Sequence, residues 1–340
     1  MGGPHQVFEQ PPAVLASLVG PRLTDALLTP PPDCASQLNT TWAWLQANPA
    51  HHVLSLADAA YPLDLLQMPD PPTLLFVHGS LVALAHPQRV AVVGSRNPTP
   101  QGQLNARQFA RSLGQAGVCV VSGLALGVDG AAHEGALDAQ APTIAVVGTG
   151  LDRVYPARHK ALAHRIAGSG ALVSEYPLGT PPMAPNFPKR NRLIAALGQG
   201  TLVVEAALQS GSLITARLAV DLGRDVFAIP GSIHSPQSRG CHALIRQGAK
   251  LVESAQDVLE ELHVMPSAAA STFTDEPPEL PAPGDAALLA ALGHDPVSLD
   301  ALQARTGWPT AQLQAALLEL ELVGEVGRLP GGLFQRLGRA

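Results

Sequence analysis

The feature that most constrains the fold is a series of short apolar runs, each separated from the next by a turn or a helical pattern. Six runs occur, at 89–94, 118–122, 143–148, 171–175, 201–205 and 225–230. Helical patterns lie between them, at 102–115, 130–139, 157–167 and 212–222. Runs of this length are typical of strands buried on both faces, and their alternation with helices indicates βαβ units. The sequence therefore predicts an α/β core, a Rossmann-like parallel sheet covered by helices on both sides.

We place this core at residues 86–264 and expect a smaller domain on each side of it. Residues 1–85 are rich in Leu and Ala and carry short helical patterns, which predict a small helical domain. Residues 265–284 have the small, polar and proline content of a linker. Residues 285–340 are expected to form three short helices and a hairpin, which together suit a winged-helix domain. The expected elements are 285–293, 298–306, 310–322 and the hairpin 323–337.

Composition limits the class of protein. Apolar residues make up 46% of the chain and charged residues 14%, which is typical of a globular protein. Cys34, Cys119 and Cys241 lie far apart without a CxxC pair, so we expect no disulfide, metal or other cofactor. No run of eighteen apolar residues occurs, and residues 1–10 do not have the pattern of a secretory signal. We therefore expect a soluble, cytoplasmic protein.

The charge distribution indicates an anionic ligand for the core, although the chain carries a net charge of −6. Residues 89–250 contain sixteen Lys and Arg against eight Asp and Glu, an excess of eight positive charges. The two flanks together contain five basic and nineteen acidic residues. A basic middle between acidic ends is the pattern expected when one domain handles a polyanion. An even spread of these charges over an ordinary surface is the alternative.

The loop after the first predicted strand suits an anion. It runs from Gly94 through Ser95 and Arg96 to Gly102, where a helix is expected. Backbone N–H groups and the positive end of the helix dipole favour an anion there. The Arg96 guanidinium can bind phosphate with two hydrogen bonds or stack on a base. The loop lacks the GxGxxG spacing of a dinucleotide site, and a plain strand–helix turn with a surface arginine fits the same residues.

The second predicted strand ends in another polar loop. Ser122 and Gly123 offer a hydroxyl and an unobstructed backbone N–H. Asp129 is placed as a helix N-cap, and His133 follows four residues later on the same helical face. The two side chains have the spacing of an acid–base couple. A cap together with a hydrogen-bonded histidine that faces the sheet is the interpretation we favour.

The densest group of cations surrounds an aromatic residue. Phe187, Lys189, Arg190, Asn191 and Arg192 follow one another at the start of a predicted helix. Proteins that bind single strands use cations for the backbone and stack bases on aromatic rings, a contact worth about 1–3 kcal/mol. The first turn of a helix is an unfavourable place for cations unless they meet something anionic. We therefore interpret the group as a binding site, with an internal ion pair of Arg190 or Arg192 as the alternative.

Ser210, Gly211 and Ser212 begin a further predicted helix with small polar residues. An ordinary capped helix explains them when they are taken alone. Several such loops nevertheless meet at the carboxyl edge of a parallel sheet, where ligands of these sheets bind. Together they predict a site for a chain of phosphates in preference to a single nucleotide.

The same residues resemble, in their order and spacing, the DprA/Smf family of DNA-processing proteins. The shared motifs are Gly94-Ser95-Arg96, Ser122-Gly123-Leu124-Ala125, Gly127-Val128-Asp129 with Ala132-His133, Gly150-Leu151-Asp152 with Tyr155-Pro156, Phe187-Pro188 with Arg190-Asn191-Arg192, Ser210 to Ala216, and Ile229-Pro230-Gly231. The resemblance covers residues 55–260. It implies an extended Rossmann fold that forms a homodimer, binds single-stranded DNA in a basic pocket, and helps to place RecA recombinase on incoming DNA during natural transformation. It also implies a SAM-like N-terminal domain and a C-terminal winged helix.

The chain departs from the family pattern at two places that concern DNA contact. Several relatives have a basic residue shortly before the Phe-Pro pair, whereas here residues 183–185 are uncharged and Lys189 follows the pair. The expected recognition helix, 310–322, contains Glu319 and Glu321 and no Lys or Arg. Helices that read duplex DNA need basic residues for phosphates. We therefore expect the winged helix to contact protein, or to tune the core, in preference to gripping duplex DNA.

The leading hypothesis is a non-catalytic mediator that binds single-stranded DNA, RecA and a second copy of itself. The residues expected to contact the strand are Gly94, Ser95, Arg96, Ser122, Gly123, Phe187, Lys189, Arg190, Asn191, Arg192, Ser210, Gly211 and Ser212. The alternative is a nucleotide-processing hydrolase of the lysine-decarboxylase-like Rossmann type. Such enzymes use a PGGxGT loop followed by Glu, whereas 210–215 lacks the paired glycines and leaves Asp129 and His133 as the acid–base pair. A third possibility, an interaction protein, predicts no affinity for single strands.

Overall fold

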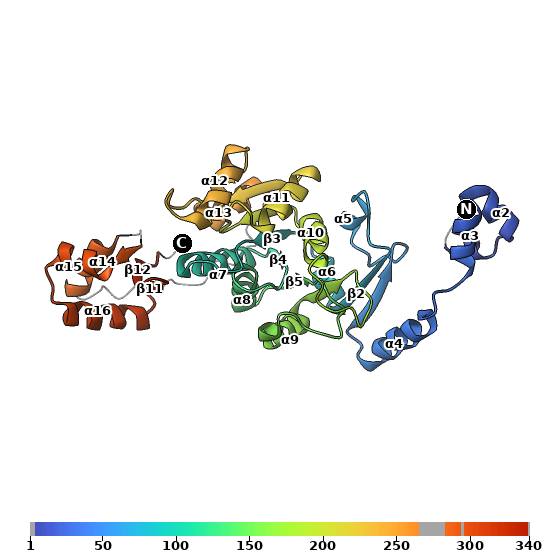
Figure 1. Cartoon of the computed structure of the whole chain (residues 1–340), viewed down its shortest axis with the longest axis horizontal. Helices are drawn as coiled ribbons and strands as arrows, with labels where there is room; N and C mark the ends of the chain where they lie inside the picture. The colour runs from blue at the N-terminus through green and yellow to red at the C-terminus, as the bar shows by residue number, and fades with distance from the viewer. Residues whose placement is uncertain (1–3, 265–282, 294–295, 339–340) are drawn as a thin grey trace. The chain divides into compact units, whose positions relative to one another are not determined.

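The computed structural model describes residues 4–264, 283–293 and 296–338. A nine-stranded sheet in the order β1-β2-β6-β5-β4-β3-β7-β8-β9 forms the centre of the fold (Figure 1). Its strands are β1 (His51–Ser55), β2 (Leu74–Gly79), β3 (Arg89–Val93), β4 (Cys119–Ser122), β5 (Thr143–Val146), β6 (Ala171–Ser174), β7 (Gly200–Val203), β8 (Asp225–Ala228) and β9 (Lys250–Leu251). All neighbours from β6 to β9 are parallel, and β1 and β2 pair antiparallel at one edge. The predicted α/β core with a mostly parallel sheet is confirmed.

Helices cover both faces of the sheet, as the uninterrupted apolar strands require. The core helices are α5 (Leu63–Leu66), α6 (Leu81–Leu84), α7 (Pro100–Gln115), α8 (Val128–Asp138), α9 (Lys160–Ser169), α10 (Asn186–Leu197), α11 (Gly211–Asp221), α12 (Arg239–Arg246) and α13 (Ala255–Glu261). Short 3₁₀ turns, η1 (Ala157–His159) and η2 (Pro236–Ser238), precede α9 and α12. The helices α10, α11 and α12 contribute to one apolar core, and α7, α8 and α13 to the core on the opposite face.

The central strand β3 shows how this two-faced burial arises. Val90 and Val92 belong to the core beneath α7 and α8, whereas Ala91 and Val93 belong to the core beneath α10 and α11. Because successive side chains of a strand point to opposite faces, a strand covered on both sides needs apolar residues at every position. Full burial of a large side chain such as Phe109 stabilises the fold by about 1.5–3 kcal/mol.

The direction of the chain changes beside β3. From β3 the strands proceed through β4 and β5 to β6 on one side, and the chain then returns to place β7, β8 and β9 on the other. The strands β3 and β7 are therefore neighbours whose following helices lie on opposite faces of the sheet. Such a switch point leaves a crevice outside the carboxyl ends of the two strands, where ligands of open α/β sheets bind.

The N-terminal boundary differs from the sequence-based expectation. The first compact unit ends at Pro49, and its helices are α1 (Pro4–Phe8), α2 (Pro12–Val19), α3 (Pro21–Leu28) and α4 (Cys34–Ala47). The expected helical domain of residues 1–85 was therefore drawn too long, because β1 and β2 belong to the large sheet. These strands add to the edge in antiparallel fashion, without the strand–helix alternation that marked the core. The likeness of the helical unit to a SAM-like domain stays a prediction.

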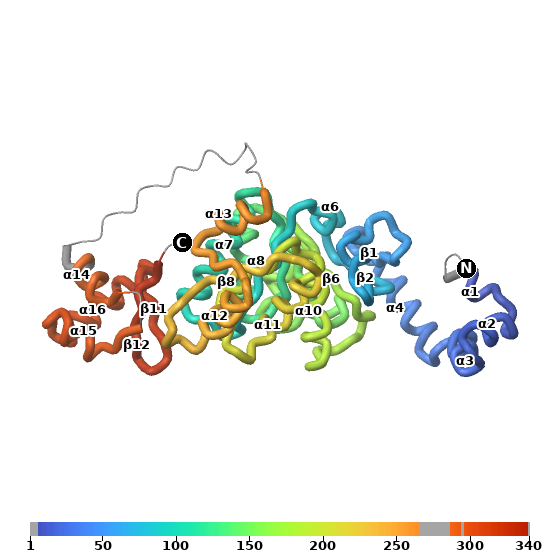
Figure 2. The backbone as a smooth tube through the Cα atoms, turned by 90° about the horizontal axis from the view of Figure 1, so that it is seen from above, coloured from blue at the N-terminus to red at the C-terminus, as the bar shows by residue number. Residues whose placement is uncertain are grey.

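The C-terminal residues form the winged-helix module that the sequence predicts. Its elements are α14 (Pro283–Leu292), β10 (Val297–Ser298), α15 (Leu299–Thr306), α16 (Thr310–Leu322), β11 (Val326–Leu329) and β12 (Leu333–Arg336), drawn in orange and red in Figure 2. The strands form a small sheet in the order β10-β12-β11. Leu302, Leu317 and Phe334 belong to an apolar core that the module forms from its own residues. The predicted linker falls outside the described residues, apart from its last two positions, which begin α14.

Candidate functional site

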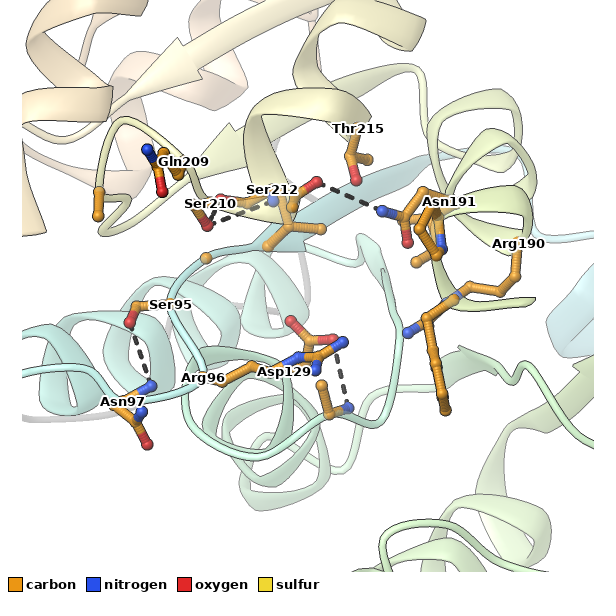
Figure 3. A pocket seen from close by; sticks show the side chains of 18 of the residues that line it. Ser95, Arg96, Asn97, Asp129, Arg190, Asn191, Gln209, Ser210, Ser212 and Thr215 are labelled. Carbon is orange, nitrogen blue, oxygen red and sulfur yellow. Dashed lines mark hydrogen bonds between the residues drawn. The ribbon is translucent and has the colours of Figure 1, made fainter. Parts of the chain in front are cut away.

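A pocket of about 460 Å³ lies outside the carboxyl ends of β3 and β7, at the switch point of the sheet (Figure 3). Four chain segments form most of its wall: the β3–α7 loop, the β4–α8 connection, the first half of α10 and the start of α11. The lining residues are Val93, Gly94, Ser95, Arg96, Asn97, Ala125, Asp129, Phe187, Pro188, Arg190, Asn191, Ile194, Ala207, Gln209, Ser210, Gly211, Ser212, Thr215 and Gln237. The structure thus brings together all four of the predicted segments.

The β3–α7 loop is held by a carboxylate from β7–α11. The Glu205 carboxylate accepts hydrogen bonds from the backbone N–H of Thr99 at 2.9 Å and from its hydroxyl at 2.6 Å. Thr99 is the N-cap of α7, and its hydroxyl accepts from Gly102 N–H at 3.0 Å. Burial raises the pKa of Glu205, while the bonds from Thr99 oppose that rise. The expected anion site at the start of α7 is therefore occupied by the protein's own side chain, because a desolvated carboxylate needs these donors.

The side chain that this loop offers to the pocket is Arg96. Its guanidinium carbon lies 5.6 Å from the centroid of the Phe187 ring, so the cation rests over the face of the aromatic ring. Arg96 is exposed, and Phe187 is half-buried at the start of α10. A cation over an aromatic face is attracted by the negative potential of that face and adds about 0.5–1 kcal/mol at exposed sites. The pair presents a positive charge and a flat apolar surface at the same wall.

One face of α10 lines the pocket, and the spacing of its residues follows the helix period. Phe187, Arg190, Asn191 and Ile194 lie at intervals of three and four residues, which places them on one side of the helix. Lys189 is exposed and lies off this face, outside the residues that line the pocket. The aromatic–basic group was predicted as one binding cluster, and the structure divides it.

The prediction that Arg192 contacts the DNA strand is wrong, because its guanidinium is bonded to other residues of the protein. It forms an ion pair with the Glu175 carboxylate and donates to the backbone carbonyl of Asp70. Both charged side chains are largely buried. Two residues along an α-helix turn the side chain by about 200°, so Arg190 and Arg192 cannot face the same pocket. The alternative interpretation, an internal ion pair, is confirmed for Arg192.

Arg190 lines the pocket but is also anchored beneath it. Its Nη1 donates to the Val146 carbonyl at 2.6 Å, and only 4% of the residue is exposed. Burial lowers the pKa of Arg190 to about 10, and the nearby Asp129 carboxylate opposes that decrease. Asp129 in turn accepts from the backbone N–H groups of Gly123 and Ala125, at 3.2 and 3.3 Å. Burial raises the pKa of Asp129, against the lowering effect of Arg190. The two charges therefore compensate each other at the base of the pocket.

Ser122 and Gly123 do not line the pocket, in contrast to the prediction. The Ser122 hydroxyl is fully buried and donates to the Val92 carbonyl at 2.6 Å. The Gly123 N–H is already bonded to Asp129. A Cβ atom at Gly123 would lie 1.9 Å from Nη1 of Arg190, so the position is occupied by glycine for lack of space. Both donors are buried beneath the pocket and are already bonded within the protein, so they stabilise the fold and are not available to a ligand.

The start of α11 faces the pocket as predicted. Ser210 is the N-cap, its hydroxyl accepts from Ser212 N–H at 3.3 Å, and the two hydroxyl oxygens are 2.7 Å apart. Asn191 from α10 donates to the Gly211 carbonyl at 3.3 Å and so joins the two helices. The positive end of the helix dipole and the unpaired N–H groups of a first turn favour an anion at such a place. Thr215 lies one turn further along the same wall.

Four polar residues of the pocket were missed by the sequence interpretation. They are Asn97, Gln209, Thr215 and Gln237. Asn97 and Gln209 stand directly beside Arg96 and Ser210, and Thr215 lies within the Ser210 to Ala216 motif, although none of the three was named as a contact. Gln237 comes from η2, and its side-chain amide donates to the Asn97 carbonyl at 3.3 Å. No local pattern marks Gln237, because its place depends on a contact across 140 residues.

Asp129 and His133 do not form the acid–base couple that their spacing allowed. The N-cap of α8 is Gly127, and the Asp129 carboxylate bonds back to the loop, so its expected role as the cap is wrong. His133 is 0% exposed, and its Nδ1 lies 2.8 Å from the Thr143 hydroxyl, which itself donates to the Val120 carbonyl. Burial lowers the pKa of His133 to about 3, with His159 and Arg190 adding to the effect. The favoured interpretation, a hydrogen-bonded histidine facing the sheet, is the one that these contacts support.

Among residues 4–264, 283–293 and 296–338, no group of three or more His, Cys, Asp or Glu side chains is arranged to hold a metal ion. Within the same ranges, none of the helices has both the length and the hydropathy that a bilayer span requires.

The fold and the pocket define a Rossmann-like protein with a winged-helix module at its C-terminal end. Residues 52–263 match the family described as DNA recombination-mediator protein A, and residues 272–332 match the DprA winged helix domain. The chain belongs to the DNA recombination-mediator protein A family, the DprA/Smf family that its motifs resemble.

Two relatives match much of the length of this chain. The chain is 45% identical to Protein Smf of Escherichia coli K12 over 311 residues, which are 89% of this chain and 82% of that protein. It is 50% identical over 207 residues to DNA processing protein DprA of Streptococcus pneumoniae R6, covering 61% of this chain and 73% of the relative.

Two solved structures of this family superpose on the chain. The X-ray structure of DprA from Streptococcus pneumoniae gives a TM-score of 0.61 at 41% identity, over 74% of this chain and 90% of the other. DprA from Helicobacter pylori gives a TM-score of 0.57 at 34% identity, over 62% of this chain and 96% of the other.

Proposed function

We propose that this protein binds single-stranded DNA in the pocket at the switch point and acts as a non-catalytic mediator of DNA processing. One observation carries the proposal: the cation of Arg96 lies over the Phe187 ring on one wall, and the first turn of α11 faces the same pocket. An aromatic face can stack a base, while Arg96 and the N–H groups of α11 can hold the phosphates on either side of it. Stacking on Phe187 requires an unpaired base, which favours a single strand over a duplex.

The amide side chains of the pocket supply both hydrogen-bond donors and acceptors. Asn97, Gln209 and Gln237 line it together with Asn191. Such groups can bond to the edge of a base as well as to a phosphate. The Helicobacter pylori relative was described for its single-stranded DNA binding mode, which supports the same ligand for this chain. Of the predicted contacts, Gly94, Ser95, Arg96, Phe187, Arg190, Asn191, Ser210, Gly211 and Ser212 are kept in this proposal.

The assignment of this protein to natural transformation is part of the proposal. In that role it would work as a cytoplasmic homodimer that protects incoming single strands and helps to load RecA recombinase onto them. The Streptococcus pneumoniae relative is a DNA processing protein, which supports the pathway. The loading step is tested by following RecA filament growth on single strands, with and without the protein. Filament growth that the protein does not accelerate would remove RecA from the proposal.

The winged-helix module is proposed to contact protein. Leu318, Glu319, Glu321 and Leu322 of α16 are exposed, and the helix carries no cation to neutralise phosphate. An acidic and apolar helix face is repelled by a duplex and suits a basic or apolar partner surface. Replacement of Glu319 and Glu321 by Gln tests this: duplex affinity should stay negligible, and only protein partners should respond.

A titration of labelled single-stranded and duplex oligonucleotides at two salt concentrations tests the proposed function. Affinity for the single strand should fall by about 0.7 log units per log unit of salt for each phosphate contact. Arg96→Ala should lower that affinity and flatten the salt dependence. The matched control is Arg111→Ala, which removes an exposed arginine in the C-terminal half of α7 that does not line the pocket. Affinity that does not depend on salt, or an Arg96→Ala variant that binds normally, would overturn the proposal.

A further inference from the structure

A second aromatic ring continues the row formed by Arg96 and Phe187. The Tyr155 ring centroid lies 5.5 Å from that of Phe187, at an angle of 40° between the planes. Tyr155 is 48% exposed and is not among the residues that line the pocket. Arg96, the half-buried Phe187 and the exposed Tyr155 therefore form a row that leads from the pocket to the surface.

The segment that carries Tyr155 is fixed beside the pocket wall. His159 in η1 places its Nδ1 3.0 Å from the carbonyl of Leu124, which lies in the β4–α8 connection next to the pocket-lining Ala125. On the other side of Tyr155, the Asp152 carboxylate accepts from Gly179 N–H at 2.8 Å. The helix α9, which follows η1, packs against α8. The segment is thus a rigid continuation of the wall.

Exposed cations follow Tyr155 along this segment. Arg158, Lys160 and Arg165 are exposed, and no ion pair involves any of the three among residues 4–264, 283–293 and 296–338. Some other surface cations of the core are neutralised, as in the pairs Arg107–Asp138 and Lys250–Glu261. The one carboxylate between 150 and 170 belongs to Asp152, which pairs with Arg153 at 3.2 Å. The segment from Arg158 to Arg165 therefore carries three unpaired positive charges and no carboxylate, shortly after Tyr155 in the chain.

We propose that Tyr155 and the basic strip of Arg158, Lys160 and Arg165 bind the part of the single strand that leaves the pocket. The inference rests on the proposed function and extends it. A base stacks on the exposed face of Tyr155, and the phosphates beyond it lie along the strip. Proteins that hold single strands combine an aromatic platform with a cationic path in this way, over about 4–16 nucleotides. An acidic protein would match the strip, but it would have no use for a ring aligned with Phe187.

Two oligonucleotides separate the pocket from the strip. An oligothymidine of about four residues fills the pocket, and one of about sixteen also reaches the strip. In the triple variant Arg158→Gln/Lys160→Gln/Arg165→Gln, the salt slope for the long strand should fall by about 2, since each lost phosphate contact removes about 0.7. Binding of the short strand should stay unchanged. Arg111→Gln is the control for loss of an exposed arginine on another helix.

Tyr155 is tested with the same pair of strands. Tyr155→Ala should weaken binding of the long strand by about 5- to 150-fold, because a stacked base contributes about 1–3 kcal/mol. Tyr155→Phe keeps the aromatic face and should bind the long strand like the native protein. The triple variant changes exposed positions and retains the fold, so it decides the question even if Tyr155→Ala disturbs the neighbouring turn.

The outcomes distinguish the two proposals. If the native protein binds neither strand, or if Arg96→Ala binds both normally, the proposed function fails. If Arg96→Ala weakens both strands while the triple variant keeps native affinity and salt slope for the long one, the inference about the strip is wrong. In that case an acidic protein becomes the partner to examine for these cations.

Discussion

The Glu205 carboxylate caps the loop that carries Arg96 through its two hydrogen bonds to Thr99, a residue 106 positions earlier in the chain. This contact joins the ends of two neighbouring strands and fills the start of α7 with an internal negative charge. A Cβ atom at Gly102 would lie 2.3 Å from the carboxylate carbon, so the surrounding backbone leaves little room for any other arrangement. The position of Arg96 therefore depends on a residue that does not itself line the pocket.

We predict that Glu205→Ala lowers the free energy of unfolding by about 1–3 kcal/mol, because the Thr99 N–H and hydroxyl lose their partner in a partly buried place. Glu205→Gln should be milder, since the amide oxygen still accepts from the N–H and the amide nitrogen can donate to the hydroxyl. Urea unfolding measures both. Asp225→Asn removes an exposed carboxylate and serves as the control, with an expected change within about 0.5 kcal/mol. Equal stabilities of all three variants would contradict the role of Glu205.

Arg96 and Arg192 should separate binding from stability. Arg192→Met leaves the buried Glu175 carboxylate without its partner, which is expected to cost about 3–5 kcal/mol of stability. Arg96→Ala removes an exposed side chain and should change the unfolding free energy by less than about 1 kcal/mol, while it weakens single-strand binding.

The double variant Arg192→Met/Glu175→Leu checks the cause of the Arg192 effect. It should recover much of the lost stability, because both charges leave the interior together. Chemical unfolding and oligonucleotide titration on the same preparations decide the matter. An Arg192→Met protein of native stability, or an Arg96→Ala protein that unfolds more easily than Arg192→Met, would show that Arg192 is not the stabilising residue of the two.

Two glycines near the pocket are predicted to respond in opposite ways to alanine. In Gly123→Ala the new methyl group meets the Arg190 guanidinium, which must move away from Val146 and Asp129. We expect a loss of about 1–3 kcal/mol in stability, as for other overpacked cores, and weaker binding. Gly211→Ala places its methyl group in open space at the first position of α11, where alanine stabilises by about 0.4–1 kcal/mol. Thermal unfolding of both variants tests the pair, and a Gly123→Ala protein as stable as Gly211→Ala would refute it.

The parts of the fold that the sequence predicts correctly are those that local patterns encode. The strand at β3 is apolar at every position because both faces are covered, and Ser210 marks the start of α11 because a cap is made by a neighbour two residues away. The antiparallel strands β1 and β2 were missed for the opposite reason. β2 is placed by its pairing with β6, much later in the chain, and β1 by its pairing with β2, and nothing in the two sequences shows these partners.

The candidate site follows the same division. Gly94, Arg96 and Phe187 reach the pocket because they directly follow a strand or begin a helix. Arg192 was misplaced, although the helix period of α10 already separates it from the face of Phe187 and Arg190. Its partner Glu175 is seventeen residues away on β6–α10, a contact that only the folded chain reveals. The sequence shows which side chains are able to bind an anion. It does not show whether another residue of the protein already holds such a side chain, as Glu175 holds Arg192.

The buried His133 should make the protein sensitive to mild acid. Its pKa is about 3 in the folded protein against an ordinary value of 6.5, because burial, His159 and Arg190 all disfavour the charged ring. Below pH 6.5 the unfolded chain therefore binds a proton that the folded chain refuses. The contribution of this residue to stability is complete above pH 6.5 and decreases as the pH falls toward 3, by at most about 1.4 kcal/mol per pH unit.

His133→Asn tests this dependence, because asparagine keeps a donor for the Thr143 hydroxyl and cannot be protonated. At pH 8 the variant should be less stable than the native protein, owing to the smaller side chain in a fully buried place. Between pH 6.5 and 5 the native protein should lose stability faster than the variant, so the difference between their unfolding free energies narrows. His234→Asn, at an exposed position, should run parallel to the native protein over the same range. Curves of His133→Asn and native protein that stay parallel would show that another group controls the acid sensitivity.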